Sequence, residues 1–163
     1  METAVSRRAV FAALALGSAL LAGCDLPRDP EGTLERVRGG VLRAGVCENP
    51  PWVTREDDRP MGVEPALIEG FAASLGARIE WRWGSAEEHF AALEHHRLDL
   101  AACGLESTTP WKKRVGLTLP YHVERRAPDA PGGRTAEHVL AVPPGENAWL
   151  VALESFLVAE APP

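Results

Sequence analysis

Residues 78–103 read RIEWRWGSAEEHFAALEHHRLDLAAC, and this stretch decides the fold class. At 78–83 apolar and polar side chains alternate, which is the pattern of a strand with one buried face. Ser85 and Glu88 have the spacing of a capping box, so they predict a helix that begins here. Residues 98–103 are almost wholly apolar and predict a second, buried strand. A strand, a helix and a strand in this order indicate an α/β protein with a mainly parallel sheet flanked by helices.

The flanking sequence continues this alternation of strands and helices. We predict a helix at 33–38 with Thr33 as its N-cap, a strand at 41–46, a loop at 47–61, a helix at 65–75, a strand at 138–142 and a final helix at 146–160. In parallel sheets, ligands bind beyond the carboxyl ends of the strands. The functional edge is therefore expected at the loops after Val46, Trp83 and Cys103.

Length, charge and cysteine content exclude several classes of protein. At 163 residues, one domain is the default. The formal net charge is −6 and there is no basic block, which argues against nucleic acid as a partner because that affinity comes largely from Lys and Arg on phosphates. Three cysteines are too few for a disulfide scaffold or a four-thiolate zinc site.

Residues 1–23 have the pattern of a lipoprotein signal peptide. Arg7 and Arg8 precede an uncharged apolar run at 11–21, which is too short to span a bilayer and is typical of a signal sequence. The run ends in Leu-Ala-Gly followed by Cys24, which resembles the bacterial lipobox. This resemblance implies cleavage before Cys24 and the attachment of several acyl chains, which anchor a protein where a single chain is marginal. The alternative is an ordinary secretion signal in which the cysteine is incidental.

The residues after the lipobox indicate where the chain is held. Asp25 resembles the acidic signal that retains lipoproteins at the inner membrane in enteric bacteria. Residues 24–32 are rich in Pro and Asp and predict a tether between lipid and domain. The expected location is therefore the periplasmic face of the cell envelope, with the protein anchored through Cys24.

A series of short motifs is spread along the domain. They are VLRAGV at 41–46, PPW at 50–52, GVE at 62–64, DLA at 99–101, GL at 104–105, TP at 109–110 and LPY at 119–121. Together they resemble the bacterial extracellular solute-binding proteins of family 3, which have the type II periplasmic binding fold and bind amino acids and similar small polar solutes. The resemblance covers about residues 33–122 and 137–158.

The resemblance extends to only one of that family's two lobes. Residues 33–123, with the returning strand and helix at 137–160, correspond to lobe one. Only residues 124–136 stand where lobe two is expected, whereas a domain of that kind takes on the order of a hundred residues. Because this segment is rich in Pro and Gly, it has the composition of a linker. The chain is thus expected to be a single α/β lobe.

The resemblance also assigns the ligand contacts, to one aromatic residue and to the loop after the third strand. The residues are Trp52, Gly104, Leu105, Glu106, Thr108, Thr109, Trp111 and Arg114. In the family, an aromatic residue near Trp52 stacks on the solute, and the loop presents backbone groups and a hydroxyl to its amino and carboxylate ends. The alternative for Trp52 is that it packs its own Pro-rich loop. Thr109 with Pro110 also has the pattern of a helix N-cap and first residue, a role compatible with ligand contact.

One position departs from the family pattern. Where the family usually places an Arg that clamps the solute's carboxylate, this chain has Trp111. Arg114 is expected beside Trp111 rather than in its place, because successive helical residues turn by about 100°. The departure favours a flatter or less anionic solute than an α-amino acid. Lys112 and Lys113 are expected on a solvated face.

Cysteine and histidine patterns leave two structural questions. Cys47 and Cys103 end strands that the family resemblance makes neighbours, so either a disulfide or two small buried thiols fits. His89, His95 and His96 lie on one predicted helix, and we expect them at the surface. The seven-residue spacing of His89 and His96 is too wide for both to bind one metal ion.

These observations lead to a binding function without catalysis. The sequence contains no nucleophile elbow, Walker loop or HExxH motif, so we expect no enzyme activity, cofactor or metal. The resemblance implies a lipid-anchored solute-binding protein of an ABC-type uptake system, truncated to one lobe, whose partners are a small polar solute, bound weakly or with a partner's help, and a permease or other membrane protein. The alternative is a single-lobe interaction or sensor-accessory lipoprotein that docks a membrane partner without capturing solute itself.

Overall fold

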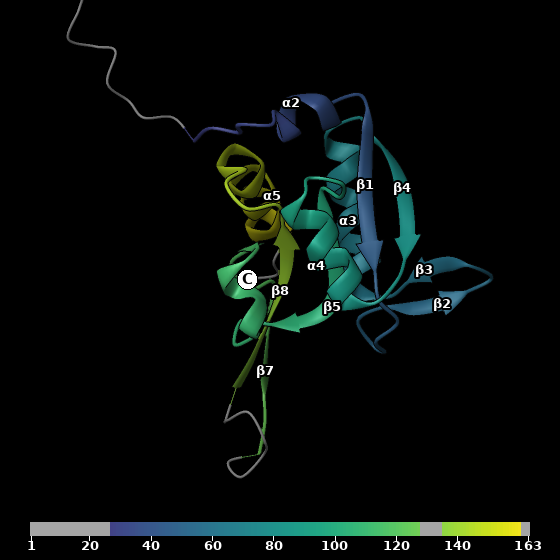
Figure 1. The fold of residues 1–163 in the computed structure, drawn as a ribbon. Coiled ribbons are helices and arrows are strands. Elements are labelled where there is room, and N and C mark those ends of the chain that lie inside the picture. Colours follow the sequence, from purple (N-terminus) through teal and green to yellow (C-terminus); the bar gives the residue numbers. More distant parts are fainter. Residues whose placement is uncertain (1–26, 128–134, 161–163) are drawn as a thin grey trace, which may run out of the picture.

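The computed structural model describes residues 27–127 and 135–160, built on a central six-stranded sheet. The strand order is β4-β1-β5-β8-β6, with β7 paired to β8 (Figure 1). The strands are β1 (Val41–Val46), β4 (Arg78–Trp83), β5 (Leu100–Glu106), β6 (Gly116–Leu117), β7 (His122–Arg125) and β8 (Thr135–Val142). β1 is parallel to β4 and β5, whereas β8 is antiparallel to β5, β6 and β7. The predicted α/β class and the parallel pairing of its first strands are confirmed.

Helices cover both faces of this sheet. They are α2 (Thr33–Val37), α3 (Val63–Ser74), α4 (Ala86–Glu94), the 3₁₀ turn η2 (Pro110–Lys113) and α5 (Asn147–Glu160). The predicted capping box is present at the start of α4, where Ser85 Oγ accepts from the Glu88 N–H and the Glu88 carboxylate accepts from the Ser85 N–H. Two backbone donors at the helix start are thereby satisfied.

Two predicted elements differ in the structure. The N-cap of α2 is Gly32 rather than Thr33, whose backbone N–H instead donates to the Glu146 carboxylate at 3.0 Å. The segment predicted as a loop at 47–61 contains a hairpin, formed by β2 (Thr54–Glu56) and β3 (Arg59–Met61). Strands of three residues carry almost no periodicity, so the sequence pattern did not reveal them.

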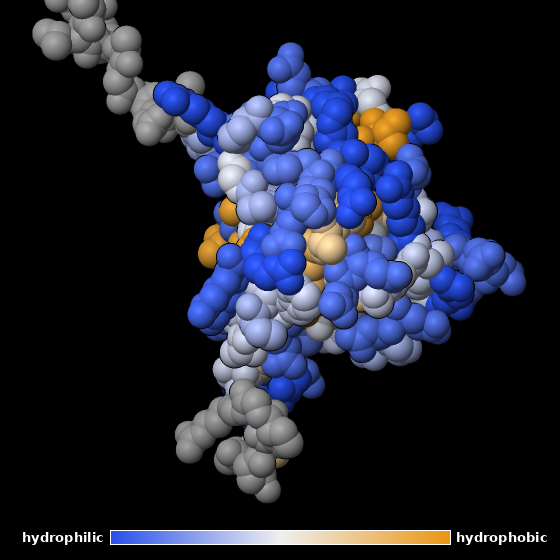
Figure 2. Space-filling model, viewed as in Figure 1, coloured by the Kyte–Doolittle hydropathy of each residue, from blue (hydrophilic) through white to orange (hydrophobic). Residues whose placement is uncertain are grey.

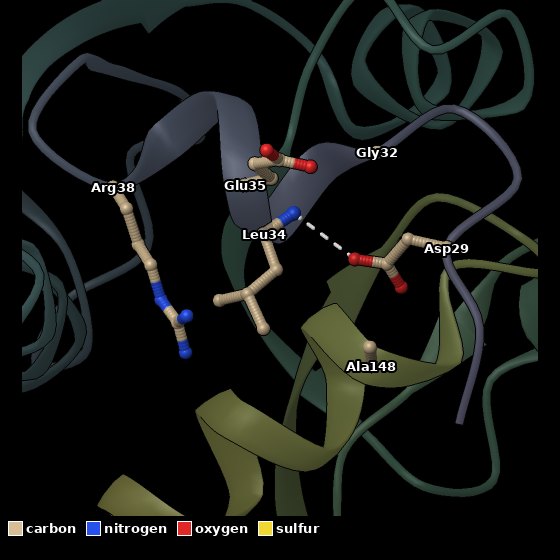
Figure 3. Close-up of a pocket in the computed structure, with 6 residues that line it drawn as sticks. All are labelled: Asp29, Gly32, Leu34, Glu35, Arg38 and Ala148. Carbon is tan, nitrogen blue, oxygen red and sulfur yellow. Dashed lines mark hydrogen bonds between the residues drawn. The ribbon is translucent and has the colours of Figure 1, made fainter. Parts of the chain in front are cut away.

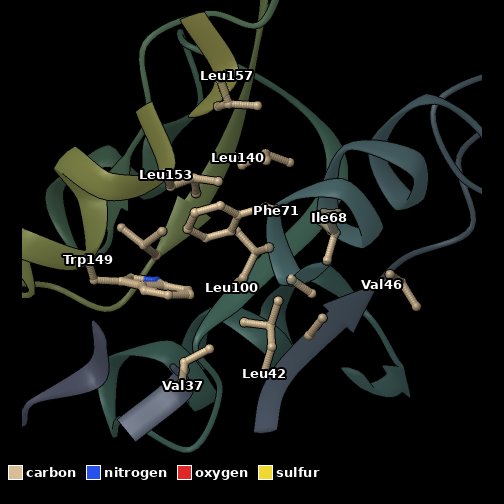
Figure 4. Close-up of a cluster of buried hydrophobic side chains, with 14 of the residues drawn as sticks. Val37, Leu42, Val46, Ile68, Phe71, Leu100, Leu140, Trp149, Leu153 and Leu157 are labelled. Carbon is tan, nitrogen blue, oxygen red and sulfur yellow. The ribbon is translucent and has the colours of Figure 1, made fainter. Parts of the chain in front are cut away.

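The apolar core lies in two layers, one on each face of the sheet. α3 and α5 pack one layer, which includes Leu42, Phe71, Leu100 and Trp149 (Figure 4). The other layer lies under α4 and includes Phe90. Burial of a single side chain of this kind stabilises the fold by about 1.5–3 kcal/mol.

A buried ion-pair network fixes the amino end of β5. Asp99 is fully buried, and its carboxylate pairs with Arg36 and Arg43 at 2.5 Å each. Burial alone would raise the pKa of Asp99, but hydrogen bonds from Arg43 and Arg36 outweigh it and lower the pKa. The backbone carbonyl of Asp99 accepts from the Trp149 indole at 2.7 Å, so this network also positions α5.

The last residues of the predicted tether are fastened to the lobe. Asp29 Oδ2 accepts from the Leu34 N–H at 3.0 Å, as drawn in Figure 3, and its Oδ1 accepts from the Trp149 N–H at 2.9 Å. Asp29 therefore joins α2 to α5. The predicted signal peptide, Cys24 and Asp25 lie outside the described residues.

β7 and β8 form a hairpin that projects beyond the rest of the lobe (Figure 1). Their register pairs His122 with His138 and Arg125 with Thr135. Strand pairing thus extends into the segment 124–136, which the composition assigned to a linker. The Pro- and Gly-rich middle of that segment, at 128–134, lies outside the described residues.

Candidate functional site

Four ring-bearing residues gather at the base of the β7–β8 hairpin, and we call them the aromatic cluster: Trp52, Tyr121, His122 and His138. The Trp52 ring stacks on His138 with 3.8 Å between centroids and 31° between planes. His122 lies 5.2 Å from the Trp52 ring, and Tyr121 meets it edge-on at 6.1 Å. Trp52 comes from the loop after β1, so the cluster lies at the edge where the sequence predicted a functional site.

The loop that carries Trp52 is closed by covalent and hydrogen bonds. Cys47, directly after β1, forms a disulfide with Cys103 of β5, across a Cα–Cα distance of 4.6 Å. Of the two alternatives left by the sequence, the structure therefore has the disulfide. Asn49 and Val53 exchange backbone hydrogen bonds at 2.8 and 3.0 Å, and the Asn49 side chain donates to the Cys103 carbonyl at 2.9 Å.

Glu64 is hydrogen-bonded to two residues of the aromatic cluster, Trp52 and Tyr121, although the motif analysis gave it no role. Its fully buried carboxylate accepts from the Gly104 N–H at 2.8 Å and from the Tyr121 hydroxyl at 2.7 Å. Burial raises the pKa of Glu64 to about 7, against the opposing effect of these two hydrogen bonds. Its own backbone N–H donates to the Trp52 carbonyl. One carboxylate thus orients both the carboxyl-terminal part of β5 and the residue before β7.

His138 is buried but poorly satisfied. The residue is 3% exposed, and neither ring nitrogen has a hydrogen-bond partner among the described residues. Its Nε2 lies 3.7 Å from the Glu124 carboxylate. Burial lowers the pKa of His138 although Glu124 and Glu106 act to raise it, so the ring is mainly neutral at pH 7. Because the imidazole stacked on Trp52 is neutral, it does not repel a cation that approaches the indole ring.

Residues 104–109 were predicted to form a loop that offers backbone groups to the solute. In the structure β5 continues to Glu106, so Gly104, Leu105 and Glu106 belong to the strand. The structure engages several of these backbone groups internally: the Gly104 N–H binds Glu64, the Ser107 N–H binds the Glu137 carbonyl at 2.8 Å, and the Thr109 N–H binds the Glu106 carbonyl at 2.9 Å. These amides are therefore unavailable to a carboxylate unless the segment 104–109 moves.

Side chains of the same segment, 104–109, differ in accessibility. Leu105 is buried in the core and pairs with Val139 of β8. Thr108 is exposed, whereas Thr109 is partly exposed and caps only the short η2, without a side-chain hydrogen bond. Glu106 remains beside the aromatic cluster, because it is the register partner of His138.

Trp111 and Arg114 contact a different part of the lobe. Trp111 packs on Phe90 of α4, with 4.9 Å between ring centroids. Arg114 does lie beside Trp111, its Cζ 4.8 Å from the indole centroid, and its guanidinium pairs with Glu94 of α4. These contacts join η2 to α4, and the structure does not bring Trp111 and Arg114 together with Trp52.

Arg126 is a site residue that the sequence analysis missed. It directly follows β7, and its guanidinium faces the Glu106 carboxylate with Nη2 2.7 Å from Oε1. Its Nε lies 3.9 Å from Glu124 Oε2. The sequence analysis missed Arg126 because the composition of residues 124–136 indicates a linker. Composition alone does not show which charged groups a side chain contacts.

The predicted surface position of His89 is wrong. His89 is 4% exposed, and its Nε2 lies 3.1 Å from the Val46 carbonyl. The helix α4 turns this side chain toward the end of β1, where an imidazole satisfies a backbone group. Among the described residues, no group of three or more His, Cys, Asp or Glu could hold a metal ion, and no helix is long and apolar enough to cross a membrane.

Two surface hollows lie elsewhere on the lobe. One, of about 400 Å³, is lined by Asp29, Gly32, Leu34, Glu35, Arg38 and Ala148 (Figure 3). The other, of about 450 Å³, is lined by Leu119, Val151, Glu154, Ser155 and Val158. Neither includes a predicted ligand-binding residue. The face shown in Figure 2 is mostly hydrophilic, with small hydrophobic patches.

The sequence is similar to known proteins over most of the lobe. The model of the bacterial extracellular solute-binding proteins, family 3, matches residues 42–158. The membrane-bound lytic murein transglycosylase F of Vibrio cholerae is 35% identical over 97 residues, covering 58% of this chain and 18% of that protein. A probable histidine-binding protein of Campylobacter jejuni is 26% identical over 86 residues, covering 52% and 34%. The chain thus spans about a fifth of the length of the transglycosylase and about a third of that of the histidine-binding protein.

Solved structures share the fold. The arginine-bound form of domain 1 from TmArgBP is 21% identical with a TM-score of 0.65, and the match covers 77% of this chain and 97% of that domain. The L-cystine solute receptor of Neisseria gonorrhoeae is 12% identical with a TM-score of 0.64, covering 78% and 90%. At these identities the likeness concerns the fold alone, and it confirms the prediction of a single lobe of a periplasmic binding protein.

Proposed function

This chain belongs to the bacterial extracellular solute-binding proteins, family 3, and we propose that it captures a small amino-acid-like solute with one lobe. The observation that carries the proposal is the aromatic cluster: an indole ring, braced by a buried imidazole, lies at the carboxyl end of β1 and β5. An indole face attracts ammonium and apolar groups by about 0.5–2 kcal/mol. The solved domain 1 with arginine bound supports capture by one lobe of this fold.

The remaining features of the proposed protein come from its sequence. The lipobox supports anchoring through Cys24, and Asp25 supports the inner membrane as the site of the anchor. The short segment 124–136 supports truncation to one lobe. We propose that the protein delivers its solute to an ABC-type permease at the periplasmic face and that it is not an enzyme.

Thermal unfolding of the full chain in mild detergent tests solute capture. The panel contains amino acids, polyamines and small organic acids. A solute at a hundred times its dissociation constant adds about 2.7 kcal/mol, which raises the midpoint by several degrees. Trp52→Ala should reduce this stabilisation by about 0.5–2 kcal/mol. Trp83→Ala is the matched control, because Trp83 packs under Arg55 and lies outside the aromatic cluster. A cooperative transition that no solute shifts would contradict the proposal.

A second candidate function is docking of a membrane partner without solute capture. Two observations favour it: several curated relatives are membrane-bound transglycosylases in which this domain is a minor part of the chain, and the hollow at α5 exposes Leu119, Val151 and Val158. A photocrosslinking residue at position 151 should then give one discrete adduct in native membranes. The same residue at position 59, on the β2–β3 hairpin, should give none, and equal labelling from both would contradict docking at α5.

A further inference from the structure

An arginine of the chain itself faces the candidate solute site. The Arg126 guanidinium presents two nitrogens to Glu106, with Nη2 2.7 Å from Oε1 and Nη1 3.4 Å from Oε2. The Arg126 side chain is 24% exposed and that of Glu106 31%, so the pair is partly shielded from water. A guanidinium that faces both oxygens of a carboxylate has the geometry by which proteins recognise this cation.

The pair adjoins the aromatic cluster through two further contacts. Glu106 is the register partner of His138, whose ring stacks on Trp52. The Glu124 carboxylate lies 3.9 Å from Arg126 Nε and 3.7 Å from His138 Nε2. The Arg126 guanidinium is thus linked to the carboxylates of Glu106 and Glu124 and, through them, to His138 and Trp52. The His138 imidazole is buried and has no hydrogen-bond partner among the described residues.

This arrangement favours cations over carboxylates. Glu106 repels the carboxylate of an amino acid and attracts an ammonium or a guanidinium group. The Gly104, Ser107 and Thr109 N–H groups, which could have bound a carboxylate, are engaged within the protein. The face of Trp52 adds cation–π attraction.

We infer that Arg126 is a tethered occupant of this site, and that the solute carries a guanidinium or ammonium group, requires no carboxylate, and displaces Arg126 from Glu106. The inference rests on the proposed function, because it names the solute class of the same site. When an internal group occupies a site, the apparent association constant of the solute equals the intrinsic one multiplied by the fraction of molecules in which the site is empty. Removing the occupant should therefore tighten binding.

Titration calorimetry of the full chain in mild detergent tests this inference with three probes. Agmatine has the guanidinium without a carboxylate, and L-arginine has both. L-citrulline keeps the α-ammonium and α-carboxylate of arginine but has a neutral urea in place of the guanidinium. We expect agmatine to bind at least as tightly as arginine. Citrulline should not bind, because its only ammonium group adjoins a carboxylate that Glu106 repels. Arg126→Ala should tighten agmatine binding about tenfold or more, with Arg126→Gln changing it in the same direction. Glu106→Gln should weaken binding about tenfold or more.

Two neighbouring variants serve as controls. Arg125→Ala removes the same charge one residue away, and Glu137→Gln alters a carboxylate bonded to Ser107 rather than to Arg126. Both should leave agmatine affinity within about twofold. Weaker binding by Arg126→Ala, or citrulline binding as tightly as arginine, would overturn the inference and leave solute capture intact. Failure of every solute in the thermal panel, with wild type and Arg126→Ala alike, would overturn the proposed function as well.

Discussion

The Glu64 carboxylate accepts a hydrogen bond of 2.7 Å from the Tyr121 hydroxyl, 57 residues away in the chain. Glu64 lies in the first turn of α3, and Tyr121 directly precedes β7. The same carboxylate binds the Gly104 N–H. This one buried group therefore connects the helix, the carboxyl-terminal part of β5 and the projecting hairpin, so its protonation state bears on the whole candidate site.

Stability should fall as the pH rises from about 4.5 to about 7 because of Glu64. Its folded-state pKa, about 7, is above the unfolded value of 4.5, so the folded chain holds a proton that the unfolded chain releases. This stabilisation is fully present below about pH 4.5 and is lost as the pH rises to about 7, a change on the order of 3 kcal/mol. Glu64→Gln should flatten this part of the profile. Urea unfolding at several pH values measures it, and a parallel profile in the variant would contradict the assignment.

Loss of the Asp99 charge should destabilise the fold strongly. Asp99→Asn leaves Arg43 partly buried without its counter-ion, and breaking a buried pair in this way costs about 3–5 kcal/mol. Chemical denaturation measures the loss. Glu80→Gln is the control: the exposed Glu80–Arg82 pair should change stability by about 0–1 kcal/mol. Equal effects of the two changes would argue against the buried network.

Removal of the disulfide should loosen the Trp52 loop. The bond joins residues 56 apart, and loss of such a native disulfide costs about 2–5 kcal/mol. We expect the double change Cys47→Ala and Cys103→Ala to lower the midpoint of thermal unfolding and to increase acrylamide quenching of tryptophan fluorescence. Dithiothreitol should reproduce both effects in the wild type and have none on the variant. A response of the variant to dithiothreitol would point to another origin.

Gly104 should tolerate no side chain. It has φ +62°, and a Cβ there would meet Asn49 Nδ2 at 2.3 Å and Trp52 Cδ1 at 2.8 Å. Gly76 is a matched control, since it has φ +63° but no neighbour within 4 Å of an added Cβ. Both Gly→Ala variants incur backbone strain of about 1 kcal/mol or more. Gly104→Ala should cost about 1–3 kcal/mol beyond Gly76→Ala in denaturant unfolding, through overpacking. Equal costs would show that Asn49 and Trp52 can move away from the added methyl group without loss of stability.

Local sequence signals predicted much of the fold. The capping box at Ser85, the alternation at 78–83 and the apolar run at 98–103, which overlaps the first half of β5, place each element in its order. Helices and strands are selected in this way by periodicity and capping over a few residues. The family motifs then placed Trp52 at the functional edge. The same signals failed for the three-residue strands β2 and β3, which are too short for a period.

The sequence by itself determined the class of fold, the family and the edge at which a ligand is expected. Only the tertiary structure decided which polar groups meet there: Glu64 with Tyr121, Arg126 with Glu106, and Trp52 with His138. It also separated Trp111 from the cluster by packing it on Phe90. The physical reason is that the periodic pattern of apolar residues along a helix or strand fixes which side chains face the core. The partner of each side chain is set instead by sheet register and by loop closure across tens of residues.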